Sequence, residues 1–427
     1  MGQQEMTGAH ADGSTAVIGA ATEFEPDVMD LLVGTLRRAV RGELPDVGTD
    51  TLLGEIVLGD TDAGAAMAPG TRKAGSLSGL IAGRAGLGWV SDDEARCMPV
   101  AAGVDLGARQ EAGEKDEAEV DAAWREARWR YGLGVRGSAP ESARVPPGMT
   151  GATRACLLLA IGSARAEGSV SVRCRHVARA LLDMPGSRAR EAMVLERLDL
   201  SAAANALDSL DASAPAQTEG PESRGVTLLR RAGTLGRSGN RLTRALVSWT
   251  SGGPVNGSPV LFAVSVEAAR QAVRSGRAAV EPVDLLLGTL ALDRALFVAG
   301  RSLPGSLAKA NSAAALMRRH GVRQFSLVSS ASMVASPSVA ASASAIPSAG
   351  VPDSGKVRLS TAADRVMAVA RLSAGEHGSP TVGTVHLLAA LLDESATDTD
   401  AVVGRLLAAD QVDVDTLRAE LGLRLGA

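Results

Sequence analysis

The chain has 427 residues, of which 45% are hydrophobic but only 2% aromatic, and its formal net charge is −4. Cores without aromatic side chains must be built from Leu, Val, Ala and Met, so the composition predicts an all-α protein and argues against a β-sandwich, since sandwiches are enriched in β-branched and aromatic residues. The acidic balance and the few aromatic side chains also argue against nucleic acid as a partner.

The cysteines and the N-terminal sequence indicate the cellular compartment of the protein and whether it holds a metal. Cys97, Cys156 and Cys174 show no CxxC spacing, which argues against a disulfide framework or a zinc site and predicts buried thiols. No basic segment followed by an apolar run opens the chain, and the longest apolar stretch, 155–164, is too short to cross a bilayer. We therefore expect a cytoplasmic protein with no membrane segment, metal or cofactor.

Four segments of the chain repeat one plan, in which an amphipathic helix, a Gly-containing turn, a Val with a short cap and a Leu-rich helix follow one another. The segments span about 26–86, 150–207, 260–320 and 357–425. In the first segment the Leu-rich helix is predicted to begin at Thr49. In the second, the run from Leu157 to Ala164 forms the first helix.

The third and fourth segments carry clearer boundary signals. In the third, Gly276 marks the turn, and Pro282 occupies the first position of the Leu-rich helix, where proline is well tolerated. In the fourth, Ser360 or Thr361 caps the first helix and Thr384 caps the second.

The stretches between these segments are predicted to be linkers. Residues 1–22 are expected to form a disordered tail, 214–240 a polar linker, and 321–356 a disordered Ser/Ala/Pro-rich linker. The insertion at 87–147 contains an acidic run and an extra predicted helix around Trp124 and Trp129. These two side chains are five positions apart and do not share one helix face, so we interpret them as partial core.

The sequence VGTVHLLAALL at 382–392 resembles the core of the repeat found in the N-terminal domain of the Clp protease chaperones. The flanking AADRVMAVAR and VDVDTLRAEL follow in the same order, VGTDTLL at 47–53 matches in the first segment, and the other two segments match by pattern. In that family two repeats pack as a pseudo-symmetric pair. The resemblance therefore implies two helical domains, 23–213 and 241–427, joined by disordered linkers.

The resemblance also implies a non-catalytic module that binds proteins or peptides. In the family this domain receives substrates and adaptors in front of AAA+ ATPase modules, yet this chain contains no G-x-x-x-x-G-K-[ST] sequence. It would then act as an adaptor, decoy or regulator of Clp-type proteolysis, with Clp ATPase or protease components, their adaptors or their substrates as partners. Because the family's domain also binds peptide-like antibiotics, sequestration of a peptide-like small molecule is the alternative.

Residues at the starts of the Leu-rich helices are the candidate ligand- or peptide-binding residues. They are Thr49, Asp50, Asp284, Thr384 and His386. In some family members the acid of the GTEH sequence helps to bind phosphorylated arginine, a role that suits a carboxylate facing a guanidinium.

The positions that match this acid are Asp50, Arg175, Val283 and Val385, so only the first segment keeps it. A plainer interpretation of Asp50, and of Asp284 one position further along its helix, is that each stabilises a helix dipole. For His386, and for His176 at the matching position, the plainer role is local packing or capping.

Two other classes of function remain open. A peptidase or hydrolase would lack the usual motifs, since neither G-x-S-x-G nor H-E-x-x-H occurs. A nucleic-acid-binding regulator would use the five arginines within 230–244 and would bind with a steep salt dependence. A solvated linker is the plainer interpretation of that segment.

Overall fold

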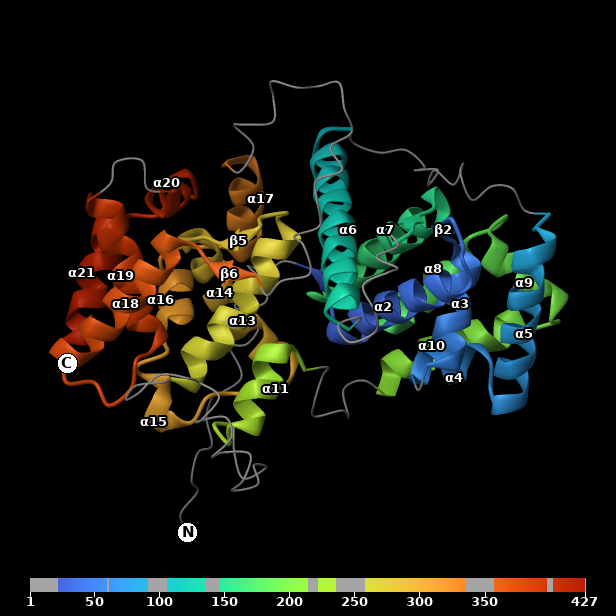
Figure 1. Ribbon diagram of the computed structural model, residues 1–427, viewed down its shortest axis with the longest axis horizontal. Helices are drawn as coiled ribbons and strands as arrows, with labels where there is room; N and C mark the ends of the chain where they lie inside the picture. The colour runs from blue at the N-terminus through green and yellow to red at the C-terminus, as the bar shows by residue number, and fades with distance from the viewer. Residues whose placement is uncertain are drawn as a thin grey trace, which may run out of the picture. The chain divides into compact units, whose positions relative to one another are not determined.

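The computed structural model describes residues 22–59, 61–90, 106–134, 146–213, 222–235, 258–334, 357–397 and 402–426. These residues are mostly helical, with strands of only two residues, so the predicted all-α class is confirmed. They divide into two compact units (Figure 1), which we call the N-terminal unit, 22–213, and the C-terminal unit, 222–426. The predicted tail lies outside the described residues except for Thr22.

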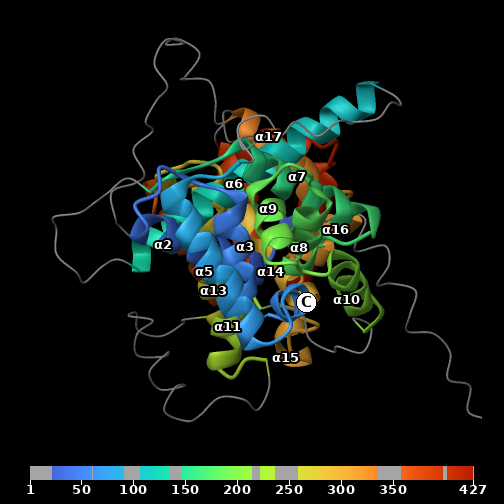
Figure 2. The same cartoon turned by 90° about the vertical axis from the view of Figure 1, so that its right-hand side faces the viewer.

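The N-terminal unit surrounds an apolar core that includes Phe24, Leu32, Leu157 and Leu181. Helices α3, α8 and α9 contact one another, as the view in Figure 2 also shows. Its elements are β1 (Glu23–Phe24), α2 (Pro26–Arg41), β2 (Asp46–Val47), α3 (Thr49–Leu58), α4 (Asp62–Met67), α5 (Thr71–Leu87), α6 (Leu106–Gly134), β3 (Gly148–Met149), α7 (Gly151–Ala166), β4 (Ser171–Val172), α8 (Cys174–Asp183), α9 (Arg188–Leu195) and α10 (Leu200–Ser213).

The C-terminal unit has its own core, which includes Leu285, Leu316, Leu387 and Leu407. Its elements are α11 (Arg224–Arg231), α13 (Pro259–Arg274), β5 (Ala279–Val280), α14 (Pro282–Val298), α15 (Gly305–Ala308), α16 (Ala313–Arg319), α17 (Gln324–Val334), β6 (Arg358–Leu359), α18 (Thr361–Glu376), α19 (Thr384–Thr397), α20 (Val402–Ala409) and α21 (Val414–Leu425).

Four helix pairs, two in each unit, share one spacing. The first helix of each pair, α2, α7, α13 or α18, has 16 residues. The second helix begins 23 positions after the first one begins, as the starting residues Pro26 and Thr49, Gly151 and Cys174, Pro259 and Pro282, and Thr361 and Thr384 show. First helices of the same length, each followed at the same offset by a second helix, recur at the four places where the sequence predicts a repeat.

The turn that ends the first helix is also the same in all four pairs. Two positions past the helix the backbone is left-handed, at Glu43, Gly168, Gly276 and Gly378. The next N–H donates to the carbonyl of an alanine five positions back, namely Ala39, Ala164, Ala272 and Ala374, at 2.8–3.0 Å. This is the pattern of a Schellman C-cap, which favours glycine at the left-handed position.

Short parallel strands join the helix pairs within each unit. In the N-terminal unit β1 pairs with β4 and β2 pairs with β3, so each pair contributes to both ladders. In the C-terminal unit β5 pairs with β6, and the N–H of Ser360 donates to the carbonyl of Val280 at 2.9 Å. The N–H of Thr150 makes the corresponding bond to Val47 at 3.0 Å.

The structure differs from the sequence prediction in two of the predicted linkers. Residues 224–231, within the stretch 214–240, form α11, which packs on α13 and α14 with Val226 and Leu229 fully buried. Residues 324–334, within the stretch 321–356, form α17, which buries Leu327 and Ala331. Residues 224–231 are polar on average and 324–334 are apolar on average, and in each helix buried apolar residues on one face dock it against the core.

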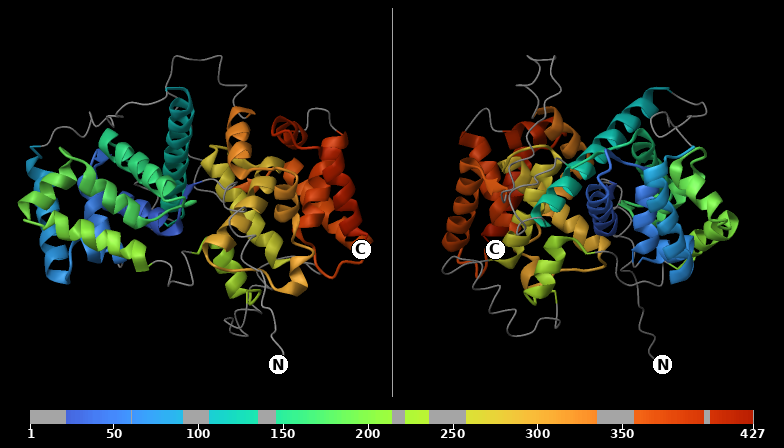
Figure 3. Two further views of the ribbon diagram at one scale, coloured as in Figure 1. Left: turned by 180° about the vertical axis from the view of Figure 1, so that it is seen from behind. Right: turned by 45° about the vertical axis from the view of Figure 1, so that its right-hand side comes forward.

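The insertion at 87–147 contains the predicted extra helix. It is α6, a helix of 29 residues, seen along its length in teal in the left panel of Figure 3. Trp124 is buried in the core of the N-terminal unit and Trp129 is half-buried. Both side chains thus contribute to packing.

Helices α13 and α14 approach closely because Gly288 has no side chain. A Cβ at this position would lie 2.7 Å from the backbone nitrogen of Ala268 and 2.8 Å from the carbonyl oxygen of Val264. Neither backbone atom can move aside without shifting α13 as a whole. The packing of the two helices therefore requires glycine at 288.

We expect Gly288→Ala to destabilise the C-terminal unit by about 1–3 kcal/mol, because overpacking a well-filled contact costs that much. Hydrogen exchange in peptides from α13 and α14 under increasing urea measures this loss. The matched control is Gly375→Ala near the end of α18, where a Cβ meets nothing within 4 Å. That change is expected to be neutral or slightly stabilising, and equal exchange in both variants would contradict the role of Gly288.

Candidate functional site

The starts of the Leu-rich helices share a capping bond made by the third residue of the helix. The N–H of the residue before the helix donates to this side chain in α8, α14 and α19. The acceptors are Nδ1 of His176, Oδ2 of Asp284 and Nδ1 of His386, at 2.9, 2.9 and 3.0 Å respectively. Two imidazoles and one carboxylate thus cap the helix start in the same way. In each case the side chain of the third helical residue places an acceptor atom beside the N–H of the residue before the helix.

Burial lowers the pKa of both of these histidines below the ordinary value of 6.5. His176 is 2% exposed and His386 is 3% exposed. For His176 the neighbouring Glu167, whose Oε2 lies 3.0 Å from Nε2, opposes the lowering. The neutral imidazole, which keeps Nδ1 as an acceptor, is therefore the form that suits the cap.

Asp284 is fully buried and holds a second partner besides the cap. Arg277, from the turn before β5, donates through Nε to its Oδ2 at 3.0 Å and through a terminal nitrogen to its Oδ1. Burial raises the pKa of the Asp284 carboxyl, although the Arg277 guanidinium opposes the rise. The Asp284 carboxylate therefore links the turn that carries Arg277 to the start of α14 inside the buried core.

The first residues of α3 and α19 make a matching contact with a later helix. The hydroxyl of Thr49 accepts the N–H of Ala189 in α9 at 3.1 Å, and the hydroxyl of Thr384 accepts the N–H of Ala313 in α16 at 3.4 Å. Both threonines are buried. Each hydroxyl thus satisfies a backbone donor at the start of a neighbouring helix, where such donors lack partners within the helix.

Asp50 lies in the first turn of α3 and is only 3% exposed. Its Oδ1 lies 3.9 Å from a terminal nitrogen of Arg188, the first residue of α9. The arginine of the protein itself therefore faces the carboxylate that the sequence resemblance assigns to a ligand. In this conformation an incoming guanidinium would have to displace Arg188.

The five sequence candidates do not come together at one place. Thr49 and Asp50 belong to the N-terminal unit, and Asp284, Thr384 and His386 belong to the C-terminal unit. Among these, Thr384 contacts a residue that lines a pocket. The N–H of Thr384 donates to Oδ1 of Asn311 at 3.0 Å, and Asn311 lines that pocket.

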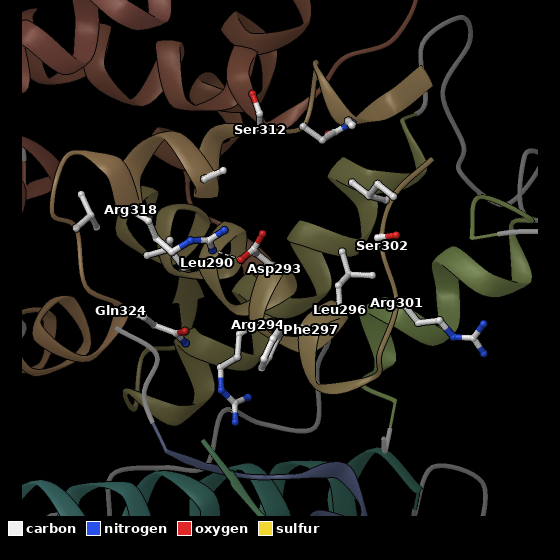
Figure 4. A pocket seen from close by; sticks show the side chains of 15 residues that line it. Leu290, Asp293, Arg294, Leu296, Phe297, Arg301, Ser302, Ser312, Arg318 and Gln324 are labelled. Carbon is white, nitrogen blue, oxygen red and sulfur yellow. Dashed lines mark hydrogen bonds and ion pairs between the residues drawn. The ribbon is translucent and has the colours of Figure 1, made fainter. Parts of the chain in front are cut away.

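The pocket has a volume of about 470 Å³ and lies in the C-terminal unit between α14, the following loop, α15 and α16 (Figure 4). Its lining combines apolar side chains with arginines. The lining residues are Leu290, Asp293, Arg294, Leu296, Phe297, Arg301, Ser302, Leu303, Ala308, Asn311, Ser312, Ala315, Arg318, Val322 and Gln324. We call it the α14 pocket.

Charged side chains of the α14 pocket have partners within the C-terminal unit. A terminal nitrogen of Arg301 lies 3.5 Å from Oε1 of Glu222, a residue outside the lining. Asp293 and Arg318 form an ion pair and point toward one another in Figure 4. Phe297 is 51% exposed and supplies a large apolar face at the same site. Such a lining is suited to a ligand with an apolar part.

Sequence reasoning missed this pocket because its residues are spread over α14, a loop and α16. One local signal was present, since Asp293 and Arg294 interrupt the otherwise apolar run LLLGTLALDRALFV at 285–298. Charged residues inside such a run require partners when the helix is buried. Only the packing of α16 against α14 brings Arg318 to Asp293.

Within the described ranges, no three His, Cys, Asp or Glu side chains are grouped as a metal site would require, and none of the helices there has the length and hydropathy to cross a membrane. Cys156 and Cys174 are buried thiols, and Cys97 lies outside the described residues. Comparison with known proteins finds no matching family model, no matching curated protein and no matching solved structure.

The lowered pKa of His386 predicts how stability depends on pH. A histidine that binds protons less well when folded stabilises the fold above pH 6.5, and this contribution is lost as the pH falls from 6.5 toward the lowered folded value. Asparagine can accept the same capping bond without titrating. We therefore expect His386→Asn to flatten the loss of unfolding free energy between pH 7 and pH 5, measured by urea titrations.

The control for this experiment is His377→Asn, in the exposed turn after α18. This variant is expected to keep most of the pH dependence of the unmodified chain, because burial is the main cause of the lowered pKa at His386. A pH profile of unfolding free energy that is the same with and without His386 would refute the assignment of this pH dependence to His386.

Proposed function

We propose that this chain is a non-catalytic module that binds peptide segments of other proteins and is built from four copies of a helical repeat like that of the Clp N-terminal domain. The proposal includes the role suggested by the sequence resemblance, that of an adaptor, decoy or regulator of Clp-type proteolysis. Its partners would then be Clp ATPase or protease components, their adaptors or their substrates.

Three regularities support the repeat. The four helix pairs share their offset, their first helices share a length of 16 residues, and their turns share the same hydrogen bond to an alanine carbonyl. The strand pairs join the first copy to the second and the third to the fourth. Such pairing is what a domain of two repeats requires.

The α14 pocket is the observation that carries the binding function. Pockets that hold ligands are commonly about 300–1,000 Å³ and mostly apolar with a few polar groups, and this one, at about 470 Å³, has both properties. Phe297 at its edge is of the residue class that anchors peptides, since aromatic side chains provide much contact area at little entropic cost.

The same pocket favours a second candidate, the sequestration of a peptide-like small molecule, because its volume also suits a compact ligand. Calorimetric titration of the chain with a panel of cyclic peptides tests this candidate. Binding that depends on Phe297 would support it, and a panel that gives no heat would remove it.

The test of the main proposal is calorimetric titration of the full chain with short unstructured apolar peptides such as Ala-Leu-Phe-Leu. We expect saturable binding that Phe297→Ala weakens about tenfold, the effect of losing roughly 1.4 kcal/mol of contact energy. The matched control is Phe262→Ala in α13, since Phe262 is 47% exposed but does not line the pocket.

Equal losses in the two variants would mean that peptides bind elsewhere on the chain. The absence of binding to any peptide in the series would refute the peptide-binding function itself.

A further inference from the structure

We propose that the α14 pocket is a specialised site of the third repeat copy, the one built on α13 and α14, and that it takes an uncharged apolar stretch of a peptide. The inference rests on the proposed peptide-binding function and adds the chemical class of the ligand and the copy that binds it. Three observations carry it: the extra residues that build the pocket, the bonds that hold these residues, and the partners of the polar groups in the lining.

The third copy is longer than the second at one place. In the second copy Ala189 lies 15 positions after Cys174, the first residue of α8, whereas in the third Ala313 lies 31 positions after Pro282, the first residue of α14. Both alanines donate their N–H to the threonine that begins a Leu-rich helix, so they mark the same place in the repeat. The additional residues lengthen the Leu-rich helix from 10 residues in α8 to 17 in α14 and form the loop that contains α15.

This longer stretch builds most of the α14 pocket. Of the 15 lining residues, 10 lie within 292–312, the part of the third copy that exceeds the second. The packing of two helices in a repeat therefore does not by itself create this cavity. It is a property of the additional residues.

The additional loop is bonded to its surroundings at its far end. The carbonyl of Ala310 accepts the N–H of the second residue of α19 at 3.1 Å, and Oδ1 of Asn311 accepts that of Thr384 at 3.0 Å. The hydroxyl of Ser312 accepts a hydrogen bond from a terminal nitrogen of Arg424 in α21 at 2.6 Å. These bonds fix the wall of the pocket before a ligand arrives, and a preformed site loses less conformational entropy on binding.

The charged groups of the lining are engaged within the protein. Asp293 forms an ion pair with Arg318, Arg301 lies beside Glu222, and Arg294 has an interaction of its own. Figure 4 shows the guanidinium groups of Arg294 and Arg301 pointing away from the cavity. A charged group that entered the pocket would have to break one of these pairs or give up its water without a new partner, and both are costly.

The surface that remains for a ligand is apolar. Leu290, Leu296 and Val322 are buried side chains of the lining, and Phe297 stands half-exposed beside them. Leu and Phe side chains match such a surface, because placing them there removes apolar area from water. The occupant is therefore an extended apolar segment of a protein chain, of the kind that unfolding exposes.

The experiment is calorimetric titration of the full chain with acetyl-Leu-Xaa-Phe-amide peptides, in which the variable residue lies between two apolar ones and must enter the pocket with them. Two matched pairs isolate the charge: Asn against Asp, and norleucine against Lys. We expect the neutral member of each pair to bind at one site per chain and roughly tenfold or more tightly than its charged partner. Added NaCl should leave the affinity of the neutral peptides unchanged.

A pocket-filling variant tests the location. Ala315 of α16 lines the pocket but is exposed, so Ala315→Trp adds bulk at the cavity without disturbing the core. It is expected to weaken the binding of the neutral peptides about tenfold or more. The matched control is Ala368→Trp in α18, at an exposed position outside the pocket, which should change nothing. Far-UV circular dichroism establishes that both variants fold.

Charged peptides that bind as tightly as their neutral partners, or more tightly, would overturn this inference and leave the peptide-binding function standing. More than one site per chain, or equal binding by Ala315→Trp and the unmodified chain, would overturn the assignment to the third copy. No binding of any of the four peptides would overturn the peptide-binding function as well. If Ala315→Trp fails to fold, the two pairs and the number of sites on the unmodified chain still decide the question.

Discussion

The close approach of helix backbones is the constraint on which the rest of this structure depends. With so few aromatic side chains, the cores can be filled only if the helices lie near one another, and glycine at the contacts allows this. Gly288 permits α14 to approach α13, and a Cβ at Gly383 would lie 2.0 Å from the carbonyl oxygen of Ala310. This second contact places the start of α19 beside the segment that leads into α16, and therefore beside the α14 pocket.

The starts of the Leu-rich helices illustrate how one structural task can be met by different residue types. His176, Asp284 and His386 accept the same capping bond although one is acidic and two are basic in their free state. Burial resolves this difference, because it favours the neutral histidines and because Arg277 balances the carboxylate. Residues that resemble a binding motif in sequence thus serve the architecture here, and the ligand-sized cavity lies elsewhere in the same unit.

The α14 pocket gains its character from elements that are far apart in the chain. Helix α14 supplies the apolar wall and two charged residues, the loop after it supplies Arg301, and α16 supplies Arg318. Helix α11 then brings Glu222 to Arg301 from before the first repeat of the C-terminal unit.

The sequence by itself determined the helical class and the stretches that hold the four helix pairs, because these follow from local periodicity and turns. It also placed the cap of α18 at Ser360 or Thr361, and Ser360 is that cap. The prediction that Thr384 caps α19 is wrong, because Thr384 is the first residue of that helix and its hydroxyl accepts the N–H of Ala313 in α16. The sequence also offered a capping role for His176 and His386, which depends on residues only three positions apart, whereas Asp284, expected to stabilise the helix dipole, accepts the same capping bond. The docking of α11 and α17 and the α14 pocket were decided only by the tertiary structure. The physical reason is that a few apolar side chains in a short segment, or pocket-lining residues scattered over α14, a loop and α16, acquire their role only from the surfaces that packing places opposite them.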